Sequence, residues 1–178
     1  MTTPVYESDN LELGPCTVYI EEDGQDASVG IIGDVTVNMG AGASPLTGAH
    51  MGDVALNKVI TGGHFRFTVQ FKEITLENFA RAFPNCVLTG DGDRVDFMPR
   101  VGLSLRSIAK KMTIKQIVGG VETTDDAKIL IIPEASPVEG EITLGYTATE
   151  QRVLAATFEA WPDDTTSRWS YIGDELAS

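Results

Sequence analysis

Residues 64–72 constrain the fold of this chain most strongly, because their side chains alternate strictly between polar and apolar. The segment reads His-Phe-Arg-Phe-Thr-Val-Gln-Phe-Lys. A period of two is typical of a strand with one face in a core and the other face in solvent. The side chains expected in the core are Phe65, Phe67, Val69 and Phe71. The side chains expected on the opposite, polar and partly basic face are His64, Arg66, Thr68, Gln70 and Lys72.

Most of the remaining segments also predict strands. β-Branched and aromatic residues favour strands, and alternation supports the assignment where it occurs. In the second of these segments, Asp34, Thr36 and Asn38 alternate with apolar residues. The expected strands are 16–20, 29–39, 128–132 (ended by Pro133), 142–146 and 152–161, with further strand-like runs around Leu103, Leu105, Met112, Ile114 and Ile117.

One segment, Thr75 to Phe83, predicts a helix. Thr75 suits the N-cap position, and Pro84 follows the last apolar residue. The apolar residues expected to pack on the core are Leu76, Phe79, Ala80 and Phe83, which have helical spacing. The predicted fold is therefore mainly β, a β-sandwich or partial barrel with one flanking α-helix. We expect a single domain over residues 1–178 with an N-terminal arm, 1–12.

Glycines are concentrated between the second and third predicted strands, in residues 40–62. This segment also contains Pro45. Connections longer than about 12–15 residues are uncommon in compact domains and are usually functional or disordered. The sequence therefore predicts a long functional loop at 40–62, within which residues 51–60 could form a short hairpin.

The charge of the chain argues against nucleic-acid binding. Acidic residues number 26 and basic residues 13, so the formal net charge is −13. Binding to phosphates requires clustered Lys and Arg, which this composition does not favour. The sequence has no apolar run of the length of a membrane span and no signal-peptide pattern at Met1. We expect a protein that is made in the cytoplasm and does not contact membranes.

Candidate catalytic groups are few. The two cysteines match no zinc spacing, and the glycines match no phosphate-binding motif. His50, Asp53, His64 and Glu73 are the one set that suggests a metal site, although their spacing fits no standard pattern. We expect no enzyme activity, no cofactor and no metal, with a metal-binding β-domain as the alternative.

The order of several short motifs resembles the major tail tube proteins of long-tailed bacteriophages. Each motif is weak alone, and the resemblance rests on their order over most of the chain. The segment 94–121 departs from the pattern and looks like an insertion. The matching segments are 11–20, 29–37, 50–54, 65–73, 75–80 and 157–164, the last containing Thr-Phe-Glu-Ala-Trp-Pro-Asp-Asp.

The resemblance implies a hexameric ring in which each copy lends about four strands to a shared inner β-barrel. Rings stack into a tube through which genomic DNA passes during ejection. About 24 strands at ~4.8 Å spacing, tilted by about 40°, enclose a channel near ~40 Å wide, enough for duplex DNA. An acidic lumen would repel phosphate, so that DNA slides without specific binding. We expect acidic residues to outnumber basic ones on the lumen.

The resemblance also implies roles for particular residues. Residues 40–62 would reach the neighbouring ring. The inter-ring contacts implied are Met51, Asp53 and Lys58. The inner-barrel positions implied are Asp34, Thr36, Asn38, Arg66, Thr68 and Gln70. The implied partners are further copies of the chain, a tape-measure protein, and tail tip and terminator proteins. The implied location is the tail of the virion. A hexameric secretion-tube protein or a head–tail connector is the alternative within the same architecture.

Overall fold

A computed structural model describes residues 15–47, 55–138 and 153–173 of the chain. This part is mainly β, with one α-helix and a sheet that does not close on itself. The strands are β1 (Cys16–Glu22), β2 (Gln25–Ser28), β3 (Ile32–Thr47), β4 (Ala55–Phe71), β5 (Cys86–Thr89), β6 (Arg94–Phe97), β7 (Lys110–Val118), β8 (Val121–Glu122), β9 (Ile129–Pro137), β10 (Leu154–Trp161) and β11 (Tyr171–Ile172). The helix is α1 (Leu76–Ala82), and two 3₁₀ turns are η2 (Leu105–Ile108) and η3 (Asp126–Lys128).

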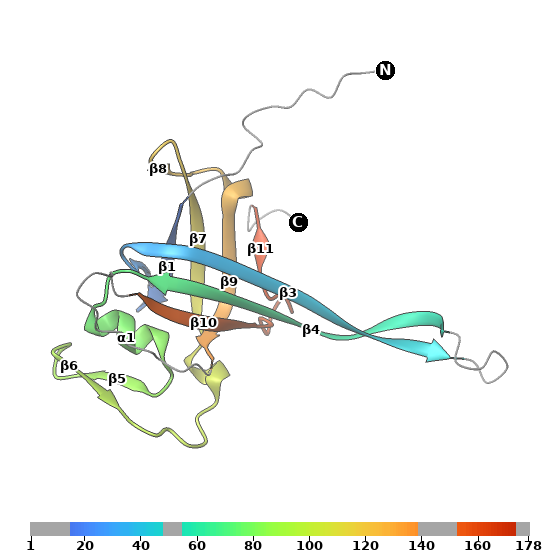
Figure 1. Cartoon of the computed structure of the whole chain (residues 1–178), viewed down its shortest axis with the longest axis horizontal. Helices are drawn as coiled ribbons and strands as arrows, with labels where there is room; N and C mark the ends of the chain where they lie inside the picture. Colours follow the sequence, from blue (N-terminus) through green and yellow to red (C-terminus); the bar gives the residue numbers. More distant parts are fainter. Residues whose placement is uncertain (1–14, 48–54, 139–152, 174–178) are drawn as a thin grey trace.

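Most of the strands form two layers that are joined through β9, and β5 and β6 form a separate two-stranded sheet. The sheet order is β2-β1-β7-β9-β10-β4-β3, and all seven strands pair antiparallel. In Figure 1, β3, β4 and β10 cross β1, β7 and β9 at a steep angle, so the sheet bends into a sandwich. We call β1, β2 and β7 with the first half of β9 the first sheet. We call β3, β4 and β10 with the last residues of β9 the second sheet.

A β-bulge at Pro133 allows β9 to belong to both sheets. Before the bulge, Ile132 pairs with Met112 of β7; after it, Ala135 pairs with Ala160 of β10. The register shift between Lys110 and Met112 leaves an extra residue on β9. Proline lacks the N–H that a regular ladder needs, but a bulge tolerates it and bends the strand. The prediction that this strand ends at Pro133 is wrong, because the proline marks the corner of the sandwich.

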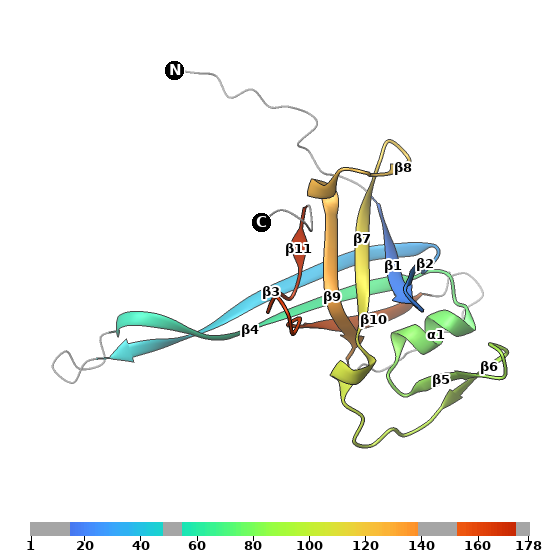
Figure 2. The same ribbon diagram turned by 180° about the vertical axis from the view of Figure 1, so that it is seen from behind.

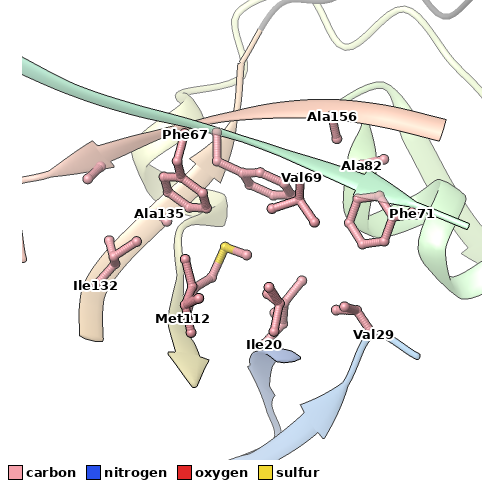
Figure 3. Packing of buried hydrophobic residues seen from close by; sticks show 14 of the residues in the cluster. Ile20, Val29, Phe67, Val69, Phe71, Ala82, Met112, Ile132, Ala135 and Ala156 are labelled. Atoms are coloured by element: carbon pink, nitrogen blue, oxygen red, sulfur yellow. The ribbon is translucent and has the colours of Figure 1, made fainter. Parts of the chain in front are cut away.

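The core lies between the two sheets. Phe65, Phe67, Val69 and Phe71 of β4 are buried, as the alternation of residues 64–72 predicted. Figure 3 shows the side chains of Phe67, Val69 and Phe71 directed toward those of Ile20, Met112 and Ile132 from the first sheet, and all of them belong to one buried cluster. The Phe67 ring also stacks on that of Phe158, its neighbour on β10, with ring centroids 5.3 Å apart.

Helix α1 covers one end of the sandwich (Figure 2). It begins after Thr75, whose side chain accepts a hydrogen bond from the Asn78 backbone N–H, as the predicted N-cap requires. Phe83 is buried and Phe79 is partly buried against the core. Leu76, however, is 42% exposed, so its prediction as a core residue is wrong. The buried side of α1 therefore differs from the predicted one: it contains Asn78 and Ala82 and leaves Leu76 at the surface.

Asn78 is buried because its amide satisfies backbone groups around it. Its Nδ2 donates hydrogen bonds to the carbonyl oxygens of Val29 and Glu73, at 3.0 and 2.8 Å. Its Oδ1 accepts a hydrogen bond from Arg81. A buried amide with these partners costs little, whereas an apolar residue would leave the carbonyls without donors. Asn78 thus ties α1 to the segment between β2 and β3.

Residues 40–62 contain strands where the sequence predicted a loop. β3 and β4 pair from Ile32 and Phe71 to Thr47 and Ala55, with a bulge where Thr61 has no partner on β3. The predicted loop is therefore wrong for 40–47, 61 and 62. Residues 55–60, which were allowed as part of a short hairpin at 51–60, form one side of a longer hairpin, and 48–54 lie outside the described residues. Glycine misled the prediction because Gly40 and the adjoining Gly63 make room for aromatic rings. A Cβ at Gly63 would lie 2.4 Å from the Trp169 ring, and a Cβ at Gly40 would lie 2.3 Å from that of His64.

Other predicted elements have mixed outcomes. The strands at 16–20 and 152–161 are confirmed as β1 and β10. Leu103 and Leu105 lie before and within η2, so their assignment to a strand is wrong. The predicted strand at 142–146 and the N-terminal arm at 1–12 lie outside the described residues. Within the described ranges, no helix is both long and apolar enough to cross a membrane.

Candidate functional site on the second sheet

The second sheet has one face in the core and one face directed away from it. The register pairs Thr36 with Thr68 and Asn38 with Arg66, so their side chains share the outer side. We call this surface the polar face. It consists of Asp34, Thr36 and Asn38 of β3, His64, Arg66, Thr68 and Gln70 of β4, and Ala155, Thr157 and Glu159 of β10. The predicted inner-barrel residues therefore lie together on one side of the sheet.

The middle of the polar face is held by two side-chain contacts between β4 and β10. The Nε and Nη2 atoms of Arg66 donate hydrogen bonds to Glu159 Oε2, at 3.2 and 3.0 Å. One pair further along, the Thr68 and Thr157 hydroxyl oxygens lie 3.0 Å apart and share a hydrogen bond. An exposed ion pair of this kind stabilises a fold by about 0–1 kcal/mol. The larger consequence is that the Arg66 charge is neutralised within the chain.

The polar face carries charges of both signs. Asp34 and Glu159 are acidic and Arg66 is basic. Lys72 follows β4 directly, and its side chain lies beside that of Gln70, because a Cβ at Gly33 would meet both. Glu134 of β9 lies on the same side as Glu159, because it pairs with Trp161. That acids outnumber bases on a lumen stays a prediction.

Beyond the core, β3 and β4 continue as a two-stranded arm. We define the arm as residues 39–47 and 55–64; Figures 1 and 2 show it projecting from the sandwich. Strand β3 advances by about eight residues from Met39 to Thr47, and at about 3.3 Å per residue the arm is roughly 26 Å long. Lys58 is exposed on the arm, whereas Met51 and Asp53 lie outside the described residues.

The arm exposes apolar side chains on both of its faces. Met39 and Ile60 are each 73% exposed, on the side that continues the core face. Leu46 and Val59 are exposed on the other side. Exposed apolar clusters of this kind mark contact surfaces in soluble proteins. An arm that is apolar on both faces suits insertion between two surfaces.

One long edge of the second sheet has no partner strand among the described residues. β3 ends the sheet order and pairs with β4 alone. An unpaired edge offers backbone N–H and C=O groups to another strand. The polar face, the arm and this edge are all carried by β3 and β4.

A second candidate region lies between α1, β5 and the first sheet. A pocket of about 350 Å³ is lined by apolar residues together with five charged ones, Glu22, Glu77, Arg81, Arg100 and Lys110. Arg81 and Lys110 donate hydrogen bonds to the Glu22 carboxylate. These bonds, chiefly the ones from Arg81, lower the pKa of Glu22 to about 2. Glu22 is thus ionised at neutral pH and has no proton to donate. Its contacts tie α1 and β7 to β1.

The alternative metal site is not assembled by the described residues. His64 is exposed on the polar face, whereas Glu73 accepts a hydrogen bond from the Ile31 backbone N–H at 3.2 Å. No group of three or more metal-ligating side chains occurs in the described ranges. His50 and Asp53 lie outside those ranges.

Sequence reasoning identified the part of the polar face that lies on β3 and β4 and missed the part that lies on β10. Thr157 and Glu159 were not predicted as site residues, although the strand that carries them was. Alternation within 152–161 could have placed both on the polar side, but it could not name their partners. The missed pairing of Glu159 with Arg66 depends on which strands are neighbours in the sheet.

Comparisons with known proteins give no family. No family model and no curated protein matches the sequence. Among solved structures, one matching chain comes from the cryo-EM structure of the anti-feeding prophage baseplate, 6-fold symmetrised. The match covers 98% of this chain and 95% of that chain, with a TM-score of 0.39 and 10% identity. A similarity this weak carries no argument about function.

Proposed function

We propose that this chain is the structural subunit of a bacteriophage tail tube. Six copies form a ring, and the rings stack into a hollow tube through which genomic DNA passes. The observation that carries the proposal is the second sheet, with a buried apolar face and an opposite face of polar side chains. The order of sequence motifs that resembles tail tube proteins supports it. No cofactor or metal is part of this function.

Closing the ring requires the second sheet to continue from one copy to the next. The last residues of β9 with β10, β4 and β3 supply four strands per copy, and the unpaired edge of β3 supplies a place for the next copy. About 24 strands around a ring enclose a channel near ~40 Å wide. In this arrangement the polar face lines the channel. Its polar side chains bond to one another, so they leave few charges free to hold the DNA that slides past them.

Stacking of rings uses the arm. Its reach of roughly 26 Å beyond the core brings the exposed Met39, Leu46, Val59 and Ile60 to a neighbouring ring. Burial of these side chains on both faces of the arm drives association. Lys58 adds a charge that an acidic neighbour would satisfy.

The remaining expectations follow from this role. The partners are further copies of the chain, a tape-measure protein, and tip and terminator proteins at the two ends of the tube. The protein is made in the host cytoplasm and ends in the tail of the virion. DNA passes without sequence-specific contacts.

The proposal is tested by comparing the assembly of the wild-type protein with that of a variant whose arm is shortened. Gly42 and Gly62 are paired, so replacing residues 43–61 with Asn-Gly closes the hairpin by a two-residue turn and preserves the register. Negative-stain electron microscopy and light scattering of the concentrated wild-type protein should show tubes. The shortened variant should fold, form rings and not stack. Tubes of normal length from this variant would remove the arm from the mechanism, and a wild-type protein without rings at any concentration contradicts the proposal.

A further inference from the structure

We infer that Glu159 keeps the channel from holding DNA, because it neutralises Arg66, the arginine of the polar face. This inference rests on the proposed function, since it assumes that the polar face lines the channel. It goes beyond that function by naming the carboxylate that decides whether the surface retains a polyanion.

The register of the second sheet places the two residues directly opposite each other. Glu159 and Arg66 are paired on β10 and β4, and two guanidinium nitrogens converge on a single carboxylate oxygen. The Arg66 side chain is 54% exposed and the Glu159 side chain 22% exposed. The arginine therefore lies within reach of a molecule on the polar face, and the glutamate occupies its donors from the side.

Removing the Glu159 charge leaves Arg66 without the carboxylate that neutralises it. With glutamine at position 159, each copy loses one negative charge beside Arg66, and a ring of six copies loses six. Each phosphate that an exposed arginine contacts releases counterions, so DNA affinity rises and becomes steeply dependent on salt.

Glu159→Gln is a suitable probe because it changes charge and preserves shape. Glutamine retains an oxygen that accepts a hydrogen bond from Arg66, and the ion pair adds little to stability because the Arg66 end of it is open to solvent. The variant should therefore fold and assemble as the wild type does. Asp26→Asn is the matched control, because it removes one exposed carboxylate from β2, on the first sheet.

The experiment assembles tubes with a fluorescent duplex of about 30 base pairs and measures the DNA that sediments with them over about 50–300 mM salt. Four samples are compared: wild type, Glu159→Gln, Asp26→Asn, and the double variant Arg66→Gln/Glu159→Gln. Microscopy of each sample records whether tubes are present. We expect Glu159→Gln to retain at least about tenfold more DNA than wild type at low salt. Its affinity should fall more steeply with salt, by about 0.9 in log–log slope for each additional phosphate that is neutralised.

The controls separate this inference from the proposed function. The double variant and Asp26→Asn should both retain as little DNA as the wild type. If tubes form but Glu159→Gln retains no more DNA than Asp26→Asn, the inference is wrong and the proposed function stands. If the double variant retains as much DNA as Glu159→Gln, Arg66 is not the retaining group and the inference is also wrong. If the wild type forms no rings or tubes, the proposed function fails and the inference fails with it.

Discussion

Replacing Ile60 on the arm should prevent rings from stacking without affecting the fold. Ile60 is 73% exposed, so Ile60→Ser removes little that stabilises the single chain. Full burial of an isoleucine side chain is worth about 1.5–3 kcal/mol, and partial burial at a ring–ring contact is worth about 1 kcal/mol. Because six copies move together, the loss for each ring–ring interface is about 6 kcal/mol. At about 1.4 kcal/mol per factor of ten, the concentration needed for tubes rises by about four orders of magnitude.

The assay is light scattering over a concentration series, with electron microscopy to distinguish rings from tubes. Val121→Ser is the matched control, because Val121 is an aliphatic residue that is 70% exposed on β8, which pairs with β7 and lies away from the arm. Both variants should unfold at the wild-type temperature, and only Ile60→Ser should lose its tubes. Tubes from Ile60→Ser at the wild-type threshold would refute the assignment of the arm to stacking.

Three further predictions concern the stability of the fold. The pKa of Glu22 is lowered from 4.5 to about 2, so its contribution is present above about pH 4.5 and is lost as the pH falls through 2. After allowance for solvent screening, Glu22→Gln should cost about 1–2 kcal/mol at about pH 7 and nothing below about pH 2, measured by denaturant unfolding, and an equal cost at both pH values would contradict it. Asn78→Leu leaves two carbonyl oxygens without donors and should cost about 2–5 kcal/mol in the same assay, whereas a cost under about 0.5 kcal/mol would contradict the role of its amide. Gly63→Ala should displace the Trp169 ring, change the tryptophan fluorescence and lower the melting temperature, and an unchanged spectrum would show that the ring does not pack there.

The parts of the fold that the sequence predicted well are those set by local pattern. The second half of β4 was identified from the alternation between Phe65 and Phe71, and its buried face follows from the same alternation. Helix α1 was identified from its N-cap and its apolar spacing. The cap is a local signal, because the Thr75 hydroxyl accepts a hydrogen bond from the backbone N–H of Asn78, three residues later. In these cases the residues that determine the structure lie within one element, so a single sequence carries the information.

The errors arise where a distant element decides the local structure. Gly63 looks like part of a loop, but it is a strand residue over which Trp169, more than 100 residues later, can pack. Pro133 looks like the end of a strand, but β9 continues past it. Strand β7 pairs with β9 on both sides of the bulge, and β10 pairs with the residues that follow the proline. Small residues and proline are read as turns unless the packing partner is known.

The sequence predicted which residues of β3 and β4 form the polar face, but it did not predict that the charge of Arg66 is neutralised. Arg66 was placed on the polar face by alternation alone. Its neutralisation was not predicted, because Glu159 lies 93 residues away and becomes its neighbour only through the pairing of β10 with β4. Cross-strand contacts of this kind depend on sheet order, which the sequence of one chain does not specify.

The most direct test of the central claim is a cryo-EM reconstruction of the assembled protein that resolves side chains. The account predicts six-fold rings with the polar face toward a channel about 40 Å wide, so that the Arg66–Glu159 pair borders the channel. It also predicts that each arm lies against the next ring, with Ile60 covered. A reconstruction with the polar face on the outside, or with no channel, would contradict the account.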